Sequence, residues 1–489
     1  MRKNTFLTII LLFVIATHTI TAQELQKCWK KQGEALKNNV LSFSFSENRS
    51  LFRYDSIPFS TMVYETRGNV SVREQVFSKQ DTLAVFGVPG YFVHSMQFTT
   101  PRESHKLNYG SSVCTRYDRL HEKYESQLVE ASRYSPVPIL YYFLSHKKDL
   151  RYRHTDSLGV YELKTKNAVI SIFINKETYL LTKASFLQSD PIFGDNNTII
   201  EYNNYQELQN SIYVSKNSFI SRYNGKIKDV VSMSDAVFVS GSLNLLPEHI
   251  CEDDDEKVNK DLSIKVNNYN DHLHFVNLEH DRTRTLLVEF RNFFVAIEAP
   301  NTSENGDLII AEAKKIAPEK PIKYFLFSHY HPSHLGGLRA FVHNGTTVVS
   351  TMDNFDFISY ISKNKRTLNP DSLQIEPKRL DIEIMDKQKV ITDGDYEMQV
   401  YVIGEESMKH TVFYFPAEKL LFEGDLIHLP GYYARRGNSH NMERELLEAI
   451  KTLDLDVDTI VQSSYEDDAY SALTIPYSDF EKFVLSLGQ

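Results

Sequence analysis

The chain has 489 residues, of which 42% are hydrophobic and 24% are charged. This balance is typical of globular proteins and excludes extensive disorder, and the length suggests two to four domains. The formal net charge of −10 provides no bulk attraction to phosphate backbones, which argues against a nucleic-acid partner. The 28 Tyr and 30 Phe, against a single Trp, favour substantial β structure.

The first 22 residues have the pattern of a secretory signal peptide. A positively charged start is followed by an apolar run over residues 6–16, and Ala22 is a small residue at which cleavage would leave Gln23 as the new N-terminus. The run is shorter than the roughly 18–20 apolar residues that a membrane-spanning helix needs. We therefore expect a cleaved signal, no transmembrane segment, and a secreted or periplasmic protein.

Three cysteines, Cys28, Cys114 and Cys251, lie too far apart in the sequence to indicate a zinc cluster. An exported protein can form one disulfide from them and keep one free thiol, but the spacing does not fix the pairing. Each cysteine can equally serve as a small, buried apolar side chain.

Residues 23–250 indicate a β-rich domain. Residues 39–47 alternate apolar and polar side chains, which is typical of a half-buried strand. Residues 168–186 indicate two such strands around a turn near residue 175. From residue 112 to about residue 145, apolar side chains recur at helical spacing until two prolines break the run, which predicts a helical insert.

This order of elements resembles the curved half-barrel of bacterial lipoprotein-carrier and lipoprotein-sorting proteins. The resemblance is one of pattern, covers about Asn39 to Phe238, and carries no sharp motif. It implies a concave apolar face suited to an acyl chain or a hydrophobic peptide. The acidic stretch 251–262 that follows has almost no apolar side chains, so we expect a solvated linker there.

Residues 263–489 show a different pattern, in which short apolar strands alternate with helices. Apolar runs at 285–289 and 293–300 are followed by a helical segment with Ile309 and Ala313 on one face, and then by a buried strand at 324–327. This alternation indicates a layered α/β domain.

The strand at 324–327 leads directly into the sequence SHYHPSHLGG, which places His329, His331 and His334 within six positions. Imidazole is a common ligand of zinc and related metals. His329 and His331 can aim at one point from a tight turn, with His334 at the start of the following helix. For a histidine triplet taken alone, a solvated polar loop is the alternative interpretation.

The blocks around this loop resemble the metallo-β-lactamase superfamily, in particular its exported hydrolases. VAIEAP, PIKYFLFSHYHPSHLGGLR, VVSTMDN, YFPAEKLLFEGDL and LDLDVDTIV follow one another in the family's order between about Leu273 and Val461. The resemblance implies an αββα sandwich over residues 263–489, preceded by the β-rich domain.

The family's metal motif, H-x-H-x-D-H, implies roles for particular residues. His329 and His331 match its first two ligands, and His334 matches its last histidine. Asp425, in the sequence FEGDL, matches the aspartate that bridges two metals in the family.

Three positions depart from that pattern. Ser333 replaces the aspartate of the motif and Ser464 stands where a final histidine is expected, and neutral alcohols are poor ligands. Glu406 lies ten residues before Pro416, where the family places its next histidine, and its carboxylate is a legitimate oxygen ligand.

The remaining ligands favour at most one metal ion, of which zinc is the first candidate. One metal position keeps two histidines and two carboxylates, namely His329, His331, Glu406 and Asp425. The other position keeps only His334 and Asp425. Three other histidines near these blocks could replace a lost ligand, but we interpret each of them as a surface or packing residue; they are His410, His428 and His440.

A single bound metal lowers the pKa of its water toward ~7 and polarises a carbonyl oxygen. Asp425 could orient that water, and His334 could act as an acid or a base. The sequence thus favours a metal-dependent hydrolase of an ester, thioester or amide with a small-molecule or acyl substrate, without establishing that the chain is an enzyme. The replacements Ser333 and Ser464 favour the alternative, a catalytically inactive scaffold that binds a lipid or protein partner of the cell envelope.

Overall fold

The computed structural model describes residues 23–52, 58–84, 92–108, 113–121, 123–240, 252–253, 262–404, 409–427, 441–463 and 474–486. The predicted signal peptide and the candidate residues Glu406, His428, His440 and Ser464 lie outside these ranges. By its internal contacts the chain separates into two compact units. The first comprises Met1–Phe52, Thr61–Ser189 and Asn196–Lys257; the second comprises Arg53–Ser60, Asp190–Asp195 and Val258–Gln489.

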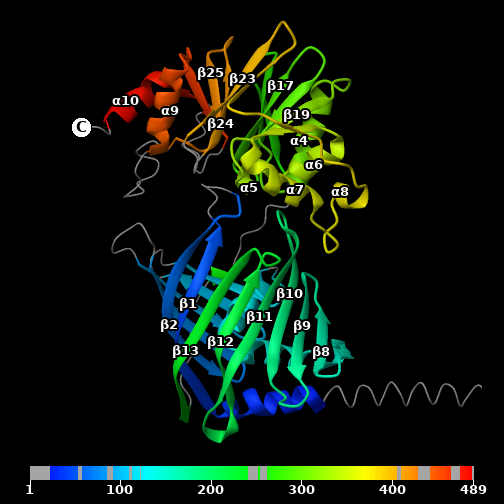
Figure 1. Cartoon of the computed structure of the whole chain (residues 1–489), viewed down its shortest axis with the longest axis vertical. Coiled ribbons are helices and arrows are strands. Elements are labelled where there is room, and N and C mark those ends of the chain that lie inside the picture. Colours follow the sequence, from blue (N-terminus) through cyan, green and yellow to red (C-terminus); the bar gives the residue numbers. More distant parts are fainter. Residues whose placement is uncertain are drawn as a thin grey trace, which may run out of the picture. The chain divides into compact units, whose positions relative to one another are not determined.

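The first unit is built on a 14-stranded sheet of order β14-β6-β5-β4-β3-β2-β1-β13-β12-β11-β10-β9-β8-β7, which Figure 1 shows as a curved sheet. Strands that follow one another in the sequence lie side by side from β1 to β6 and from β7 to β13, and β1 pairs antiparallel with β13. The strands are β1 (Asn39–Phe52), β2 (Thr61–Arg73), β3 (Val76–Ala84), β4 (Phe92–Thr99), β5 (Glu103–Asn108), β6 (Val113–Asp118), β7 (Arg151–His154), β8 (Leu158–Lys164), β9 (Ala168–Asn175), β10 (Leu181–Asp190), β11 (Gly194–Glu207), β12 (Tyr213–Arg222), β13 (Ile227–Ser240) and β14 (Glu252–Asp253).

The helical insert lies between β6 and β7 and consists of two helices, α2 (Tyr124–Tyr134) and α3 (Val137–Ser145). The short 3-10 turns of this unit are η1 (Glu34–Lys37), η2 (Lys147–Asp149) and η3 (Gln209–Ser211). Pro136 is the N-cap residue of α3, so the prolines separate the two helices as the sequence predicts. The prediction was wrong at its start, because residues 113–118 form β6 and pair antiparallel with β5.

Of the acidic stretch 251–262, the structure describes only residues 252, 253 and 262. Glu252 and Asp253 form β14 and pair in parallel with Thr115 and Arg116 of β6, and the linker stays a prediction. Cys114, in β6, is disulfide-bonded, whereas Cys28 is a buried free thiol whose pKa is raised by burial. One disulfide and one free thiol are what the sequence allowed.

The second unit contains two sheets, a seven-stranded one of order β15 to β21 and a six-stranded one of order β22 to β27 (Figure 1). The strands are β15 (Ile264–Asn268), β16 (Leu273–Leu278), β17 (Thr283–Glu289), β18 (Phe294–Ile297), β19 (Ile322–Leu326), β20 (Thr347–Ser350), β21 (Ile382–Ile384), β22 (Gln388–Thr392), β23 (Glu397–Ile403), β24 (His410–Phe415), β25 (Leu420–Glu423), β26 (Thr459–Gln462) and β27 (Ile475–Pro476). The helices are α4 (Ser303–Ile316), α5 (Pro332–Leu335), α6 (Leu338–Asn344), α7 (Phe355–Lys363), α8 (Ser372–Ile375), α9 (Asn441–Thr452) and α10 (Tyr477–Ser486), with a 3-10 turn η4 (Met352–Asn354).

The two sheets share one apolar core. Side chains of the first sheet, such as Phe275 and Leu326, pack in one cluster with Val400 and Phe422 of the second. A separate cluster joins the other face of the second sheet to α9 and α10, while α4 and α6 contact strands β16 and β20 of the first sheet. Helices therefore pack against both sheets.

Glycines set the course of the chain just after the histidine loop. A Cβ atom on Gly306 of α4 would lie 2.5 Å from the carbonyl oxygen of Gly337, and one on Gly336 would lie 2.4 Å from the carbonyl carbon of Asn301. Atoms other than hydrogen cannot approach this closely without a bond, so a side chain at either position would push the backbones apart. These contacts fix α5, which carries His334, against the start of α4.

We expect Gly306→Ala to destabilise the protein by about 1–3 kcal/mol, because the added methyl group overpacks the contact between α4 and Gly337. The midpoint of urea unfolding measures the change. Lys314→Ala, an exposed position on the same helix, serves as the control and should leave the midpoint unchanged. Equal midpoints for the glycine variant and the wild type would contradict the tight approach.

Candidate metal centre

The candidate site lies where strands of both sheets end. His329 follows β19, His331 is the N-cap residue of α5, and His334 lies within α5. His410 begins β24, and Asp425 follows β25. The backbone N–H of Thr411 donates to the carbonyl oxygen of Ser328 (2.7 Å), which ties the first sheet to the second beside His329 and His410.

The imidazole rings and the Asp425 carboxylate converge. Ring centroids of His329 lie 4.2 Å from His334, 4.6 Å from His410 and 5.9 Å from His331. Two groups each bring their ligand atoms within 4.8 Å of one another: His329, His331 and His334, and then His329, His410 and Asp425. Two ligands at about 2.1 Å from one zinc ion lie roughly 3.4 Å apart, and His329 Nε2 lies 3.8 Å from Asp425 Oδ1.

The structure therefore brings together four of the five metal ligands predicted from the sequence, namely His329, His331, His334 and Asp425. The fifth, Glu406, lies outside the described residues and stays a prediction. His410, which the sequence argument treated as a surface or packing residue, instead lies in the cluster and is only 5% exposed. Counting ten residues back from Pro416 selected Glu406 as the metal ligand. The sequence feature that points to His410 as a ligand is its place at the start of the buried strand β24.

The charges of the cluster suit a divalent cation. Burial, followed by the charge on His334, lowers the pKa of His331 to about 4 and the pKa of His329 well below its usual value. Both imidazoles are therefore neutral at pH 7 and offer a lone pair. Burial raises the pKa of Asp425, but His329 and His334 outweigh it and hold that pKa well below its usual range, so the carboxylate is ionised.

His334 lies between two carboxylates. Its Nδ1 is 3.1 Å from Glu298 Oε2 and its Nε2 is 3.6 Å from Asp425 Oδ1. Burial lowers the pKa of His334, but the charges of Glu298 and Asp425 outweigh it and raise this pKa to about 10. Glu298 is itself fixed by the N–H of Ser328 (3.0 Å). Among the described residues, the buried His334 Nε2 has no partner within hydrogen-bond distance, and Asp425 is the carboxylate that it faces.

Hydroxyl groups stand beside the imidazoles as hydrogen-bonding neighbours. Ser333, at the position of the family's aspartate, hydrogen-bonds through its Oγ to His331 Nδ1. The Nδ1 atom of His331 is thus engaged by Ser333. Ser463, next to the predicted replacement Ser464, donates from Oγ to the carbonyl oxygen of Gly424 (3.0 Å) and lies 3.4 Å from His334 Nδ1.

The chain is similar to solved structures of two kinds. One is a metallo-β-lactamase from Pontibacter korlensis, with 17% identity and a TM-score of 0.34 over 46% of this chain and 98% of that chain. Another is the metallo-β-lactamase FIM-1 from Pseudomonas aeruginosa in its mono-zinc form, with 17% identity and a TM-score of 0.34 over 47% of this chain and 96% of that chain.

The second kind is a putative outer membrane lipoprotein-sorting protein domain from Vibrio parahaemolyticus, with 11% identity and a TM-score of 0.30 over 46% of this chain and 93% of that chain. Both kinds of protein that the sequence resembles are thus found among similar solved structures. No protein-family model and no curated protein matches the chain.

The raised pKa of His334 predicts how the stability of the metal-free protein depends on pH. Its folded-state pKa, about 10, exceeds the value of about 6.5 in an unfolded chain. The stabilisation by Glu298 and Asp425 is therefore complete below pH ~6.5 and is lost as the pH rises toward 10. We expect His334→Gln to lower the stability more at pH 6 than at pH 9.5, as measured by urea unfolding in excess chelator.

His343, a half-buried histidine on α6 that lies outside the cluster, gives the matched control. His343→Gln should change the stability little at either pH. A cost of His334→Gln that is the same at both pH values would show that the imidazole carries no extra proton in the folded state.

Proposed function

We propose that the second unit is an αββα metallo-β-lactamase-like domain that binds one divalent metal ion, with zinc as the first candidate, and hydrolyses an ester, thioester or amide. The observation that carries this proposal is the convergence of His329, His410 and Asp425, whose ligand atoms lie within 4.8 Å of one another. Two sheets that share a core, with helices packed against each, support the αββα architecture.

The donor set fits a metal of the zinc type. His329, His410 and Asp425 would hold the ion, with His331 as the fourth ligand; two or three imidazoles with a carboxylate are a common set for catalytic zinc. Glu406 is the sequence's candidate for a further oxygen ligand. The two groups of ligand atoms share His329, and Ser333 hydrogen-bonds to His331. Both features favour one ion over two.

When bound, such an ion supplies a water of lowered pKa and polarises the carbonyl oxygen of the substrate. The side chain of Asp425 is 40% exposed, so one of its oxygens can accept a proton from the attacking water. His334 holds a proton and directs Nε2 toward Asp425, and it can donate that proton to the leaving group. Asp425 thus supplies the base, and His334 beside it supplies the acid.

We also propose that the protein is exported to the periplasm or secreted. The signal-like residues 1–22 motivate this proposal, and the disulfide at Cys114 supports it because disulfides persist in oxidising compartments. Among the described residues, no helix is long and apolar enough to span a bilayer.

One observation favours the non-enzymatic alternative, a scaffold with an envelope lipid or protein partner. In the metal-free protein, the carboxylates of Glu298 and Asp425 balance the positive charge on His334. The second metal position, that of His334 and Asp425, therefore needs no ion to balance the charge of its carboxylates. A protein that stays metal-free under all conditions would be of this kind.

Metal content tests the ligand set. We expect wild-type protein loaded with zinc and desalted to retain one ion per chain, measured by plasma mass spectrometry. His410→Ala should weaken zinc binding by about 100-fold or more in calorimetry, since loss of an outer partner alone costs 10–100-fold. The control His343→Ala should bind like the wild type. Unchanged affinity in His410→Ala would remove this residue from the centre.

Turnover separates the hydrolase from the scaffold. Zinc-loaded protein should hydrolyse at least one member of a panel of nitrophenyl esters, thioesters and anilides, and Asp425→Asn should lower that rate by at least about 100-fold. Measurements at pH 7 with chelator-treated protein give the background. A protein that binds zinc tightly yet shows no turnover above this background on any substrate would favour the scaffold.

A further inference from the structure

The concave side of the first unit's curved sheet is occupied by the helical insert. Helix α2 contacts β4 and β5 and also β12 and β13, strands that lie on opposite sides of β1 in the sheet. Only a sheet that curves around the helix can reach it from both sides. Apolar side chains of α2, α3 and the inward face of β1, such as Leu128, Phe143 and Phe45, form one core cluster with the rest of the sheet.

Helix α2 has almost no solvent-exposed face. Eight of its eleven residues are buried, including the charged Glu125 and Arg133 and the polar Ser132. A helix that swings away as a lid keeps a polar outer face in water. Burial around most of the circumference is instead the property of a helix inside a core.

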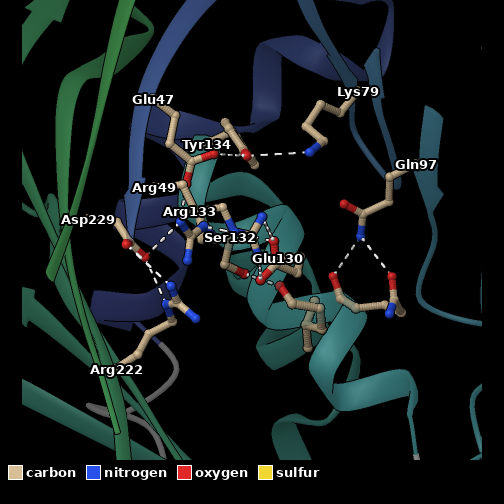
Figure 2. Close-up of polar contacts among 12 residues, drawn as sticks. Glu47, Arg49, Lys79, Gln97, Glu130, Ser132, Arg133, Tyr134, Arg222 and Asp229 are labelled. Atoms are coloured by element: carbon tan, nitrogen blue, oxygen red, sulfur yellow. Dashed lines mark hydrogen bonds and ion pairs between the residues drawn. The ribbon is translucent and has the colours of Figure 1, made fainter. Parts of the chain in front are cut away.

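A charge network locks α2 to the sheet (Figure 2). Arg133 is fully buried and its Nη2 contacts the carboxylates of Glu47 on β1 and Asp229 on β13, the latter at 2.9 Å. Tyr134 donates its hydroxyl to Glu47 (2.6 Å). On the same carboxylate of Asp229, Arg222 of β12 donates from Nε at 2.8 Å. The helix and three strands therefore share two buried anions.

Further bonds hold the same helix. Arg49 of β1 donates two hydrogen bonds, each 3.1 Å long, to the carboxylate of Glu130 (Figure 2). Tyr202 of β11 donates to the carbonyl oxygen of Ser132 (2.8 Å), and Gln97 of β4 donates to that of Gln127 (2.9 Å). Burial raises the pKa of Glu130, but Arg49 and Arg133 outweigh it and hold that pKa far below its usual range, so the pair stays charged.

The slot that the described residues outline beside the helices is small. An apolar slot between α2, α3 and the β2–β3 turn, lined by Phe77, Leu128, Val137 and Tyr141 among others, has a cavity volume of about 10 Å³. That is room for about one water molecule, whereas a cavity that takes benzene measures roughly 150 Å³. An acyl chain does not fit.

We infer that α2 and α3 are a permanent filling of the concave face, so that the first unit takes no acyl chain there and is not a lipid carrier. Moving α2 out would break the ion pairs of Arg133 with Glu47 and Asp229 and would expose the apolar side chains that α2 and α3 pack against the sheet to water, which is unfavourable. The inference is independent of the metal centre.

Hydrogen exchange of the full-length wild-type protein tests this inference. We expect amides of Tyr124–Tyr134 to exchange as slowly as those of β1 and β13, within about threefold, with or without palmitate. We also expect dansyl-undecanoate, a fluorescent fatty acid, to show no saturable binding. Exchange of α2 more than tenfold faster than that of β1, or saturable binding that speeds it, would overturn the inference.

A pair of variants tests the lock itself. Glu47→Gln removes the anion shared by Arg133 and Tyr134 and should speed exchange of α2 more than tenfold. Glu65→Gln, an exposed position on the neighbouring strand β2, should leave it unchanged. If the Glu47→Gln protein folds and the amides of α2 exchange as slowly as in the wild type, Glu47 does not hold the helix in place. If that variant does not fold, the exchange measured on the wild-type protein still tests the inference.

Discussion

One backbone hydrogen bond sets the geometry of the candidate centre. The N–H of Thr411 binds the carbonyl oxygen of Ser328 and so joins β24 to the end of β19, strands that belong to different sheets. His329 and His410 are the neighbours of these two residues in the sequence, and the bond brings their rings to 4.6 Å. Without this bond, Asp425 would be the one candidate ligand that the described part of the second sheet places near the histidine loop.

The rest of the site supports that contact. Glu298 accepts the N–H of Ser328 and lies beside His334, so a single carboxylate fixes both ends of the loop. Gly306, Gly336 and Gly337 let α4 and α5 approach closely enough for this arrangement. The neutral imidazoles of His329 and His331 and the ionised Asp425 then lie together beside the protonated His334.

Buried charges have different consequences in the two units. In the first, Arg133 is surrounded by Glu47 and Asp229 and is inaccessible, so the network fixes a helix in place. In the second, Asp425 remains partly exposed beside His334, so its charge can act on a ligand or a water molecule. The buried network of the first unit is therefore structural, whereas the candidate metal centre lies in the second unit.

Much of this could be predicted from the sequence. The strands at residues 39–47 and 168–186 were confirmed, and each alternates apolar and polar side chains. Motif and order also predicted that His329, His331, His334 and Asp425 lie close together, as they do, while their role as ligands stays a prediction. Residues 113–118 were misassigned because six residues of mixed polarity carry no clear period, and only pairing with β5 makes them a strand.

His410 was considered as a replacement ligand and set aside in favour of a surface or packing role, because its place beside His329 and Asp425 depends on the fold of the second sheet, which spacing along a sequence does not give. The buried network around Arg133 was equally out of reach from the sequence, because its members come from strands and a helix up to 182 positions apart (229 − 47 = 182).

The most direct test of the central claim is the zinc-edge X-ray absorption spectrum of the zinc-loaded, full-length protein. The structure predicts imidazole nitrogens at about 2.0–2.1 Å and the loss of one imidazole in His410→Gln relative to the wild type. An identical imidazole count in the two proteins would contradict the claim that β19 and β24 together hold one ion.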